Sequence, residues 1–466
     1  MNKIIILFML ITAYTLKSNE ITGSWNGILK VQGMQFTIVF NISESDSGLV
    51  STMDSPDQNT FGIPVTETKY ESQNLTLEVK SAGITYHGIL KEGIIEGTFK
   101  QSGLEFSLNL TREMQEKIIP KRPQDPKVPY PYNSEDVKFI NKKDSITLAG
   151  TFTYPMNTGI FPTVVLISGS GPQNRNEELM GHKPFLVLSD YFTRNGIAVL
   201  RFDDRGFGES EGDFTSATSF DFAEDVRSAI EYLKTRSEVD KDNIGLVGHS
   251  EGGIIAPIVG SKDNGDVAFM VLLAGTGIRG DKLLLLQQEL IYKSMSMADD
   301  KIQQILATNK SIFDLIINER DNAALKIKMT ERIKTYIKEN AEFVPEGLSE
   351  EQFLEMQINT TMSPWMLNFI RMEPSDYLKK VTCPVLAVNG EKDIQVPSKI
   401  NLESIESALK SGGNSSVQTI EYPGLNHLFQ KCNKCDISEY GDIEETFSTD
   451  VMFDIVKWIK EGIRKN

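Results

Sequence analysis

Basic residues, histidine and cysteine are all scarce in this sequence. Its 466 residues include 48 Lys and Arg against 64 Asp and Glu, a formal net charge of −16 at pH 7. Such an acidic chain supplies no basic groove for nucleic acid and is disfavoured at anionic membranes. We therefore expect no nucleic-acid partner.

Only four histidines are present, so chemistry that needs an imidazole must use His87, His182, His249 or His427.

The apolar run at the N-terminus is short. Residues 4–13 contain only Thr12 as a polar residue and follow Lys3. A positive residue before an apolar run too short to span a bilayer is typical of a secretory signal peptide. We predict a signal peptide at residues 1–18, export to the periplasm or the extracellular space, and no stable membrane insertion. The alternatives are an uncleaved anchor or an ordinary N-terminal strand.

Residues 19–112 consist of short runs that alternate between apolar and polar residues, broken by Gly, Asn and Asp. This pattern predicts a small antiparallel β domain, either a barrel or a sandwich. Its only histidine is His87 and it holds no chemical cluster, so we expect a structural or docking module. Residues 113–133 are rich in proline and predict an extended linker.

From residue 134 onward, apolar strand patterns alternate with helical ones, which indicates an α/β domain with a mostly parallel sheet covered on both faces. We assign residues 134–278 and 376–466 to it. Between them, residues 279–375 lose the strand pattern and predict a helical insertion that caps the site; a plain structural addition is the alternative. Trp365 and Phe369 in this insertion could line a substrate pocket, although core packing explains each equally well.

A short strand pattern ends in Gly-His-Ser-Glu-Gly at residues 248–252 and is followed at once by a helix-like run. Strand, serine in a sharp turn, then helix is the order of a nucleophile elbow. Strand and helix nearly touch there, so the flanking positions must be small, and Gly248 and Gly252 meet this demand. The backbone amide of Glu251 would face a developing oxyanion. The alternative is an ordinary turn in which Ser250 is bracketed by glycines.

A serine nucleophile needs a base, and the base needs a carboxylate. His427 is the only histidine downstream of Ser250, in a loop after the last expected strand, and Asp393 follows the strand before it. His249 is adjacent to the serine, so its side chain should point away from the hydroxyl. The order Ser, Asp, His, each at the carboxyl end of a strand, predicts a triad of these three residues. Glu391 is the alternative acid.

A second oxyanion donor should come from the loop after the strand expected at residues 161–167. The sequence has Ser-Gly-Ser-Gly-Pro there, at residues 168–172. We predict that the backbone amide of Ser170, or that of Gly171, is this donor. The alternative is a glycine turn with no part in catalysis.

Beside the elbow, three segments carry a family likeness: Gly-Ser-Gly-Pro at 169–172, Arg-Phe-Asp-Asp-Arg-Gly at 201–206 and Asn-Gly-Glu-Lys-Asp at 389–393. Together they resemble the α/β-hydrolase superfamily, in particular its secreted bacterial carboxylesterases related to prolyl oligopeptidase-type serine peptidases. The resemblance covers residues 136–278 and 383–466. It implies an α/β-hydrolase fold with Ser250 as nucleophile, Asp393 as acid and His427 as base, and it implies no cofactor.

These features favour a serine hydrolase that cleaves a small-molecule carboxylic ester through an acyl-enzyme. An exopeptidase or aminoacyl-amide hydrolase of the prolyl oligopeptidase type is the alternative. No acidic pair that would hold a substrate ammonium stands out in the sheet-domain loops. A non-catalytic binding protein with a degenerate hydrolase domain is a third hypothesis, against which the intact order of Ser, Asp and His argues. The oligomeric state stays open.

Two of the three cysteines, Cys432 and Cys435, follow closely on His427. In an exported protein we expect a disulfide between them, which would pin the histidine loop. Two reduced thiols are the next alternative. A metal site of His427 with both cysteines is disfavoured, because it needs a fourth ligand and would consume the catalytic base. We expect Cys383 to lie in the core.

Overall fold

The computed structural model describes residues 20–31, 34–46, 48–101, 104–117, 120–262, 265–340, 344 and 348–463. The chain forms two units, residues 1–119 with 333–357 and residues 120–332 with 358–466. The predicted signal peptide, residues 1–18, lies outside the described part. No helix in the described part combines the length and the apolar character that crossing a membrane requires.

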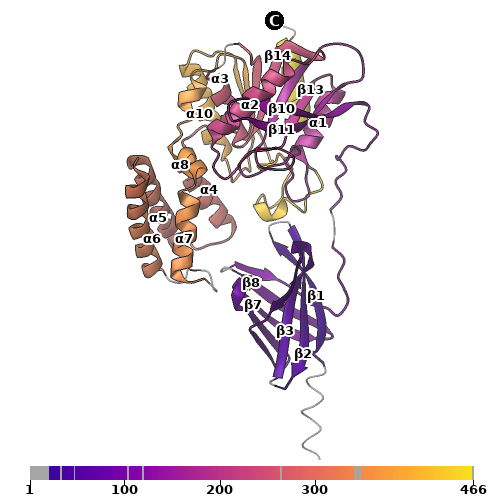
Figure 1. Cartoon of the computed structure of the whole chain (residues 1–466), viewed down its shortest axis with the longest axis vertical. Coiled ribbons are helices and arrows are strands. Elements are labelled where there is room, and N and C mark those ends of the chain that lie inside the picture. Colours follow the sequence, from indigo (N-terminus) through magenta and orange to yellow (C-terminus); the bar gives the residue numbers. More distant parts are fainter. Residues whose placement is uncertain are drawn as a thin grey trace, which may run out of the picture. The chain divides into compact units, whose positions relative to one another are not determined.

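Two antiparallel sheets form the N-terminal β region (Figure 1). Their strands are β1 (Gly23–Val31), β2 (Met34–Ser45), β3 (Gly48–Ser55) and β4 (Thr60–Pro64), then β5 (Glu67–Glu71), β6 (Asn74–Val79), β7 (Ile84–Lys91), β8 (Ile94–Gln101) and β9 (Leu104–Ser107). Trp25 and Phe40 from the first sheet and Tyr86 and Phe99 from the second belong to one core. The predicted antiparallel β region is confirmed, and it consists of two successive meanders.

Within the described residues, the larger sheet has eight strands in the order β10-β11-β13-β12-β14-β15-β16-β17. They are β10 (Tyr132–Asn141), β11 (Ile146–Pro155), β12 (Phe161–Ile167), β13 (Ala198–Phe202), β14 (Val239–His249), β15 (Phe269–Leu273), β16 (Val385–Gly390) and β17 (Val417–Tyr422). β11 pairs antiparallel with β10 and with β13, and the remaining neighbours pair parallel. The expected mostly parallel sheet is confirmed, with an antiparallel edge.

Helices cover both faces of this sheet (Figure 1). One face carries α1 (Pro184–Arg194) and α11 (Thr449–Ile463), and the other carries α2 (Ser219–Leu233), α3 (Gly252–Gly260) and α10 (Ser398–Ser411). Strand residues alternate between the two cores: Leu246 packs with α2 and α3, and its neighbour Val247 packs with α1 and α11. Burial of both faces explains why the central strands are apolar throughout.

Helices fill the described chain between β15 and β16. They are α4 (Gly280–Ser294), α5 (Asp299–Asn318), α6 (Asn322–Glu339), α7 (Glu350–Thr361), α8 (Pro364–Arg371) and α9 (Ser375–Leu378). The start of α4 packs tightly on α8, because a Cβ added to Gly280 would lie 2.1 Å from the carbonyl oxygen of Phe369. The last of these helices, α9, ends at Leu378, whereas the helical insertion was expected to end at residue 375.

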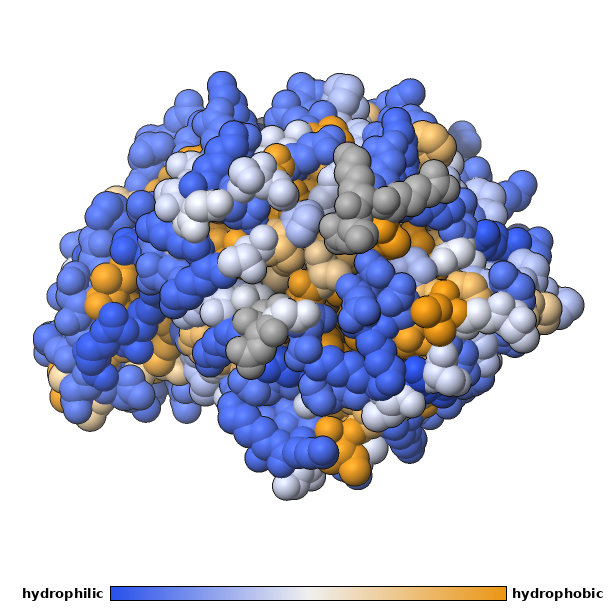
Figure 2. Space-filling model, turned by 90° about the horizontal axis from the view of Figure 1, so that it is seen from above, coloured by the Kyte–Doolittle hydropathy of each residue, from blue (hydrophilic) through white to orange (hydrophobic). Residues whose placement is uncertain are grey.

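The face of the molecule in Figure 2 is mostly hydrophilic, and its hydrophobic residues occur in scattered groups. This agrees with a chain in which 24% of the residues are charged. Such a surface is ordinary for a folded protein in water, where single exposed apolar residues need no special explanation.

Candidate active site

The elbow around Ser250 has the geometry that its glycines predict. β14 ends at His249, Ser250 adopts a left-handed φ of +53°, and α3 begins at Gly252. A Cβ on Gly248 would lie 2.0 Å from the carbonyl oxygen of Gly252, and one on Gly252 would lie 2.2 Å from that of Ile167. Strand and helix can therefore cross at this point only because both positions lack a side chain.

His427 and Asp393 meet in loops at the carboxyl ends of neighbouring strands β17 and β16. Nδ1 of His427 lies 2.8 Å from Oδ2 of Asp393, and both side chains are buried. The other carboxylate oxygen of Asp393 accepts the backbone amides of Gln395 and Val396, at 2.8 Å each. Asp393 is thus held on one side by its own loop and offers the other side to the imidazole.

The alternative acid, Glu391, lies elsewhere. Its carboxylate accepts the backbone amide of Gly424 at 3.0 Å and pairs with Lys392 at 3.2 Å. These contacts lower the pKa of Glu391, the amide of Gly424 contributing most. The structure therefore brings Asp393, and not Glu391, to the ring of His427.

Ser250 forms no hydrogen bond to this pair, but its neighbour in the chain contacts His427. The preceding residue, His249, contacts the backbone carbonyl of His427 through Nε2 at 3.1 Å, and the two imidazole rings are 4.8 Å apart. Among the described residues, Oγ of Ser250 has no hydrogen-bond partner. In enzymes without bound substrate, the bond from nucleophile to base is often long and shortens when substrate binds.

The loop predicted to complete the oxyanion hole runs directly past Ser250. A Cβ added to Gly169 would lie 3.2 Å from the Cβ of Ser250. The backbone amide of Gly169 is already engaged with Glu177 at 2.8 Å. In the described part of the chain, the amides of Ser170, Gly171 and Glu251 have no protein acceptor.

The side chain of Glu251 points into the protein, away from solvent. Its Oε1 accepts the hydroxyl of Ser219 at 2.6 Å and the indole N–H of Trp365 at 2.8 Å. Burial raises the pKa of this carboxyl. Trp365 stacks on Phe369 with ring centroids 5.0 Å apart, and both rings pack on the core that contains α2, α3 and α10.

The two residues suggested as pocket walls therefore have clear packing roles. Trp365 joins helix α8 to the residue that follows Ser250, and Phe369 is buried and stacks on Trp365. Core packing, the alternative given for both residues, describes Phe369, whereas the bond from the indole of Trp365 to Glu251 has no signal in the sequence.

Sequence analysis also missed the roles of two groups near the site, Glu177 and His182. Glu177 lies in the loop before α1, and its carboxylate oxygen Oε1 is 2.9 Å from Nδ1 of His249. His182 is fully buried: Nδ1 contacts the Thr446 hydroxyl at 2.9 Å and Nε2 contacts the Tyr440 carbonyl at 2.8 Å. Nothing in their neighbouring sequence indicates these long-range partners.

His182 makes a testable contribution to stability. Burial lowers its pKa to about 4, whereas an unfolded histidine titrates near 6.5. Between these values the unfolded chain binds the extra proton, so stability falls as the pH drops from about 6.5 to about 4. We expect His182→Gln to remove up to about 1.4 kcal/mol per pH unit of this dependence. Urea unfolding of both proteins across this window measures the difference, and equal slopes would show that His182 does not titrate in this way.

A disulfide joins Cys432 and Cys435, whose Cα atoms are 5.0 Å apart. The carboxylate of Glu439 accepts the backbone amides of Asn433, Lys434 and Cys435. The disulfide and the hydrogen bonds to Glu439 thus both restrain the loop that follows His427. Cys383 is half-buried and packs on the main core.

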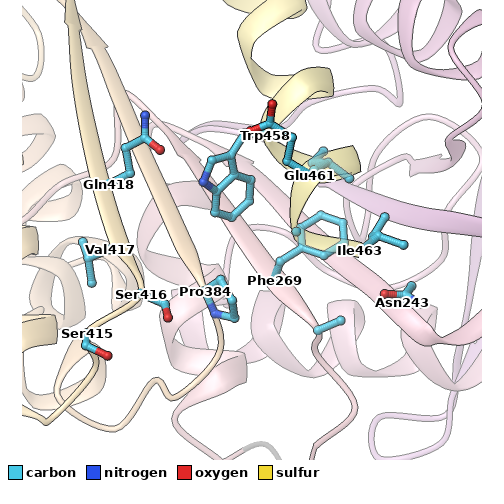
Figure 3. Close-up of a pocket in the computed structure, with 13 residues that line it drawn as sticks. Asn243, Phe269, Pro384, Ser415, Ser416, Val417, Gln418, Trp458, Glu461 and Ile463 are labelled. Atoms are coloured by element: carbon cyan, nitrogen blue, oxygen red, sulfur yellow. The ribbon is translucent and has the colours of Figure 1, made fainter. Parts of the chain in front are cut away.

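One cavity, of about 430 Å³, lies at the opposite end of the sheet from Ser250, Asp393 and His427. Figure 3 shows Phe269, Pro384, Val417 and Trp458 along its walls. These residues mark the beginnings of β15, β16 and β17 together with the end of α11. Ser250 and its partners follow the opposite, carboxyl ends of the strands, so this cavity is not the predicted active site.

A groove of about 800 Å³ lies beside Asp393, which forms part of its wall. Leu286 and Leu290 of α4 line one side, and Ile394 and Pro397 of the loop after β16 line the other. Its lining combines these apolar residues with charged ones, among them Glu289, Lys392 and Glu403.

The chain is similar to several known proteins. Esterase EstD of Thermotoga maritima is 24% identical over 318 residues, which are 67% of this chain and 65% of the esterase, so the match spans just under two thirds of that relative's length. The bifunctional esterase/perhydrolase DCH of Acinetobacter calcoaceticus is 26% identical over 245 residues, 51% of this chain and 77% of that protein. The solved structure of a Pyrococcus furiosus esterase aligns with 74% of this chain and 99% of its own, at 14% identity and a TM-score of 0.43.

The sequence profile of one family, described as serine aminopeptidase S33, matches residues 184–431. The match covers just over half of the chain and includes Ser250, Asp393 and His427. The chain therefore belongs to the serine aminopeptidase S33 family of hydrolases, within the α/β-hydrolase superfamily.

Proposed function

We propose that the protein is a serine hydrolase that cleaves small-molecule carboxylic esters, with Ser250 as nucleophile, His427 as general base and Asp393 as the acid that orients it. The observation that carries this proposal is the buried contact of 2.8 Å between His427 Nδ1 and Asp393 Oδ2, at the sheet edge where the strained elbow holds Ser250. A carboxylate on Nδ1 leaves Nε2 as the nitrogen that can accept a proton.

The reaction follows from these positions. Nε2 of His427 removes the proton from Ser250 as its oxygen attacks the ester carbonyl, and the carbonyl electron pair moves onto oxygen. The amides of Glu251 and Ser170, or Gly171 in place of Ser170, then stabilise the oxyanion. His427 gives its proton to the departing alkoxide, which leaves an acyl group on Ser250. A water molecule activated by His427 releases the acid and restores the serine.

Two of the nearby carboxyl groups, Glu251 and Asp204, are poorly suited to bind the ammonium of an aminoacyl amide. A substrate ammonium would need a free carboxylate. Glu251 is occupied by Ser219 and Trp365, and burial raises its pKa. Asp204 accepts bonds from Ser168 and Gln173, and removal from bulk water raises its pKa to about 8. Both carboxyls are therefore engaged in hydrogen bonds within the protein.

Aminoacyl-amide hydrolysis is the second candidate, because the matching family is described as serine aminopeptidase. The test is a panel of p-nitrophenyl acyl esters, acetylated sugars and aminoacyl p-nitroanilides, each assayed with wild type and with Ser250→Ala. We expect Ser250-dependent turnover of acyl esters and much slower turnover of the anilides. A higher kcat/KM for the anilides would favour the aminopeptidase, and activity that Ser250→Ala retains would refute both candidates.

We also propose that residues 1–18 direct export to the periplasm or the extracellular space, as in the secreted bacterial carboxylesterases that the sequence resembles. The disulfide between Cys432 and Cys435 supports an oxidising compartment. Residues 279–375 act as a cap, for which the bond from Trp365 to Glu251 is the support. Residues 19–112 serve as a docking or structural module, joined by a linker at 113–133 to the hydrolase domain formed by residues 134–278 and 376–466.

A further inference from the structure

A second imidazole–carboxylate pair, His249 with Glu177, lies behind the predicted catalytic histidine. We propose that these two are positioning residues: a buried imidazolium–carboxylate pair that holds the loop of the general base and the oxyanion loop in fixed relation. The inference rests on the proposed function, because it takes Ser250 as nucleophile and His427 as base.

Both ring nitrogens of His249 face oxygen atoms. Nδ1 lies 2.9 Å from Oε1 of Glu177, and Nε2 lies 3.1 Å from the backbone carbonyl oxygen of His427. A carbonyl oxygen can only accept a hydrogen bond, so Nε2 carries a proton. An ionised carboxylate can also only accept, so Nδ1 then carries a proton as well. With both nitrogens protonated, His249 is a cation and cannot serve as a base for Ser250.

The contacts around the pair favour a proton on both ring nitrogens of His249. The Glu177 oxygen that faces Nδ1 of His249, Oε1, also accepts the backbone amide of Gly169 at 2.8 Å, so it serves as an acceptor in both contacts. Burial alone would lower the pKa of His249, but the Glu177 carboxylate and the His427 carbonyl together raise it. Asp393 adds a weaker attraction in the same direction, and the ring of His427 lies 4.8 Å away.

The pair is enclosed. The side chains of His249 and Glu177 are 7% and 6% exposed, and Phe185, Leu273 and Phe447 lie around them. In such apolar surroundings, loss of one partner leaves the other as an uncompensated buried charge, which is strongly unfavourable. The two side chains therefore keep each other in place, and backbone groups that bond to them are held as well.

Two backbone segments of the proposed machinery are fixed to this pair. Nε2 of His249 bonds the carbonyl of His427, the residue whose ring takes the proton. Oε1 of Glu177 bonds the amide of Gly169, the neighbour of the oxyanion donor Ser170. Because the two loops share one anchor, displacement of either partner moves the base and the oxyanion hole relative to Ser250. A displacement of about 1 Å in such a site costs about 10²-fold in rate.

The first test is kinetic. Glu177→Gln, His249→Gln and the double variant are compared with wild type on a small soluble acyl ester. We expect kcat to fall about 10²-fold in each, with KM changed less than about threefold, because the loss concerns alignment of the reacting groups. The double variant should be no slower than the slower single variant, as expected for two residues that act as a unit. His87→Gln, on an exposed strand position in the β region, is the matched control and should keep wild-type kcat.

The second test uses wild type, so it holds even if the variants fold poorly. Nitrogen NMR of protein labelled with ¹⁵N-histidine gives four imidazoles to assign, and His249→Gln identifies the resonances of His249. We expect both its nitrogens to be protonated at neutral pH. A neutral, singly protonated His249 would overturn the ion pair, and a folded Glu177→Gln variant with wild-type kcat would overturn the positioning role. If Ser250→Ala stays fully active, the proposed function fails, while the NMR result still decides the state of the pair.

Discussion

Replacement of Ser250 by alanine is expected to lower kcat for a small acyl ester by about 10⁶-fold, the loss found when the nucleophile of a serine hydrolase is removed. The physical reason is that no other oxygen occupies the elbow, so no acyl-enzyme can form. Alanine also has a Cβ, so the left-handed φ of +53° at this position costs a similar amount of strain in both proteins. We therefore expect the thermal midpoint to change little.

A matched control is Ser261→Ala, which removes a hydroxyl at the other end of α3, where it bonds the carbonyl of Ile258. This variant should keep wild-type kcat. Steady-state assays with circular dichroism melting on both variants separate loss of chemistry from loss of fold. If Ser250→Ala retained more than about one hundredth of wild-type kcat while folded, its assignment as nucleophile would be wrong.

Replacement of Asp393 by asparagine is expected to lower kcat by about 10⁴-fold. The asparagine carbonyl can still accept the amides of Gln395 and Val396 that now bond Oδ1, so the loop should keep its shape. The amide NH₂ then faces Nδ1 of His427 and can no longer accept its proton. The imidazole is driven to the tautomer in which Nε2 carries the hydrogen, and it loses its role as a base.

Glu391→Gln is the control for this substitution, because it changes the acid two positions earlier in the same loop. Glu391 is exposed and bonds the amide of Gly424, without contact to His427. We expect this variant to keep near-normal kcat. The opposite result, with Asp393→Asn active and Glu391→Gln impaired, would mean that the histidine is oriented by the other carboxylate.

The framework of the site could be predicted from sequence because each part has a local signal. The strand expected at residues 161–167 has these bounds in the structure, where it is β12 (Phe161–Ile167). Gly248 is required by its close approach to the backbone of Gly252, a contact within the elbow itself. Ser250, Asp393 and His427 each follow the carboxyl end of a parallel strand, so all three lie at the same end of the sheet.

The supporting contacts could not be predicted in the same way. Glu177 and His249 are 72 residues apart, and Glu251 and Trp365 are 114 residues apart. Their meeting depends on how loops pack over the sheet, and neither hydrophobic period nor turn residues encode that. Because His249 is adjacent to Ser250, the sequence predicts that its side chain points away from the serine hydroxyl. It does not predict which groups the imidazole contacts there, which are the Glu177 carboxylate and the His427 carbonyl.

The most direct test of the proposed nucleophile is reaction of the purified protein with a fluorophosphonate, followed by mass mapping of the labelled peptide. We expect one phosphonyl group per chain, attached to Ser250, with no label in Ser250→Ala and slow labelling in His427→Ala. A protein that hydrolyses acyl esters yet takes no label, or takes it on a different residue, would contradict the assignment of Ser250.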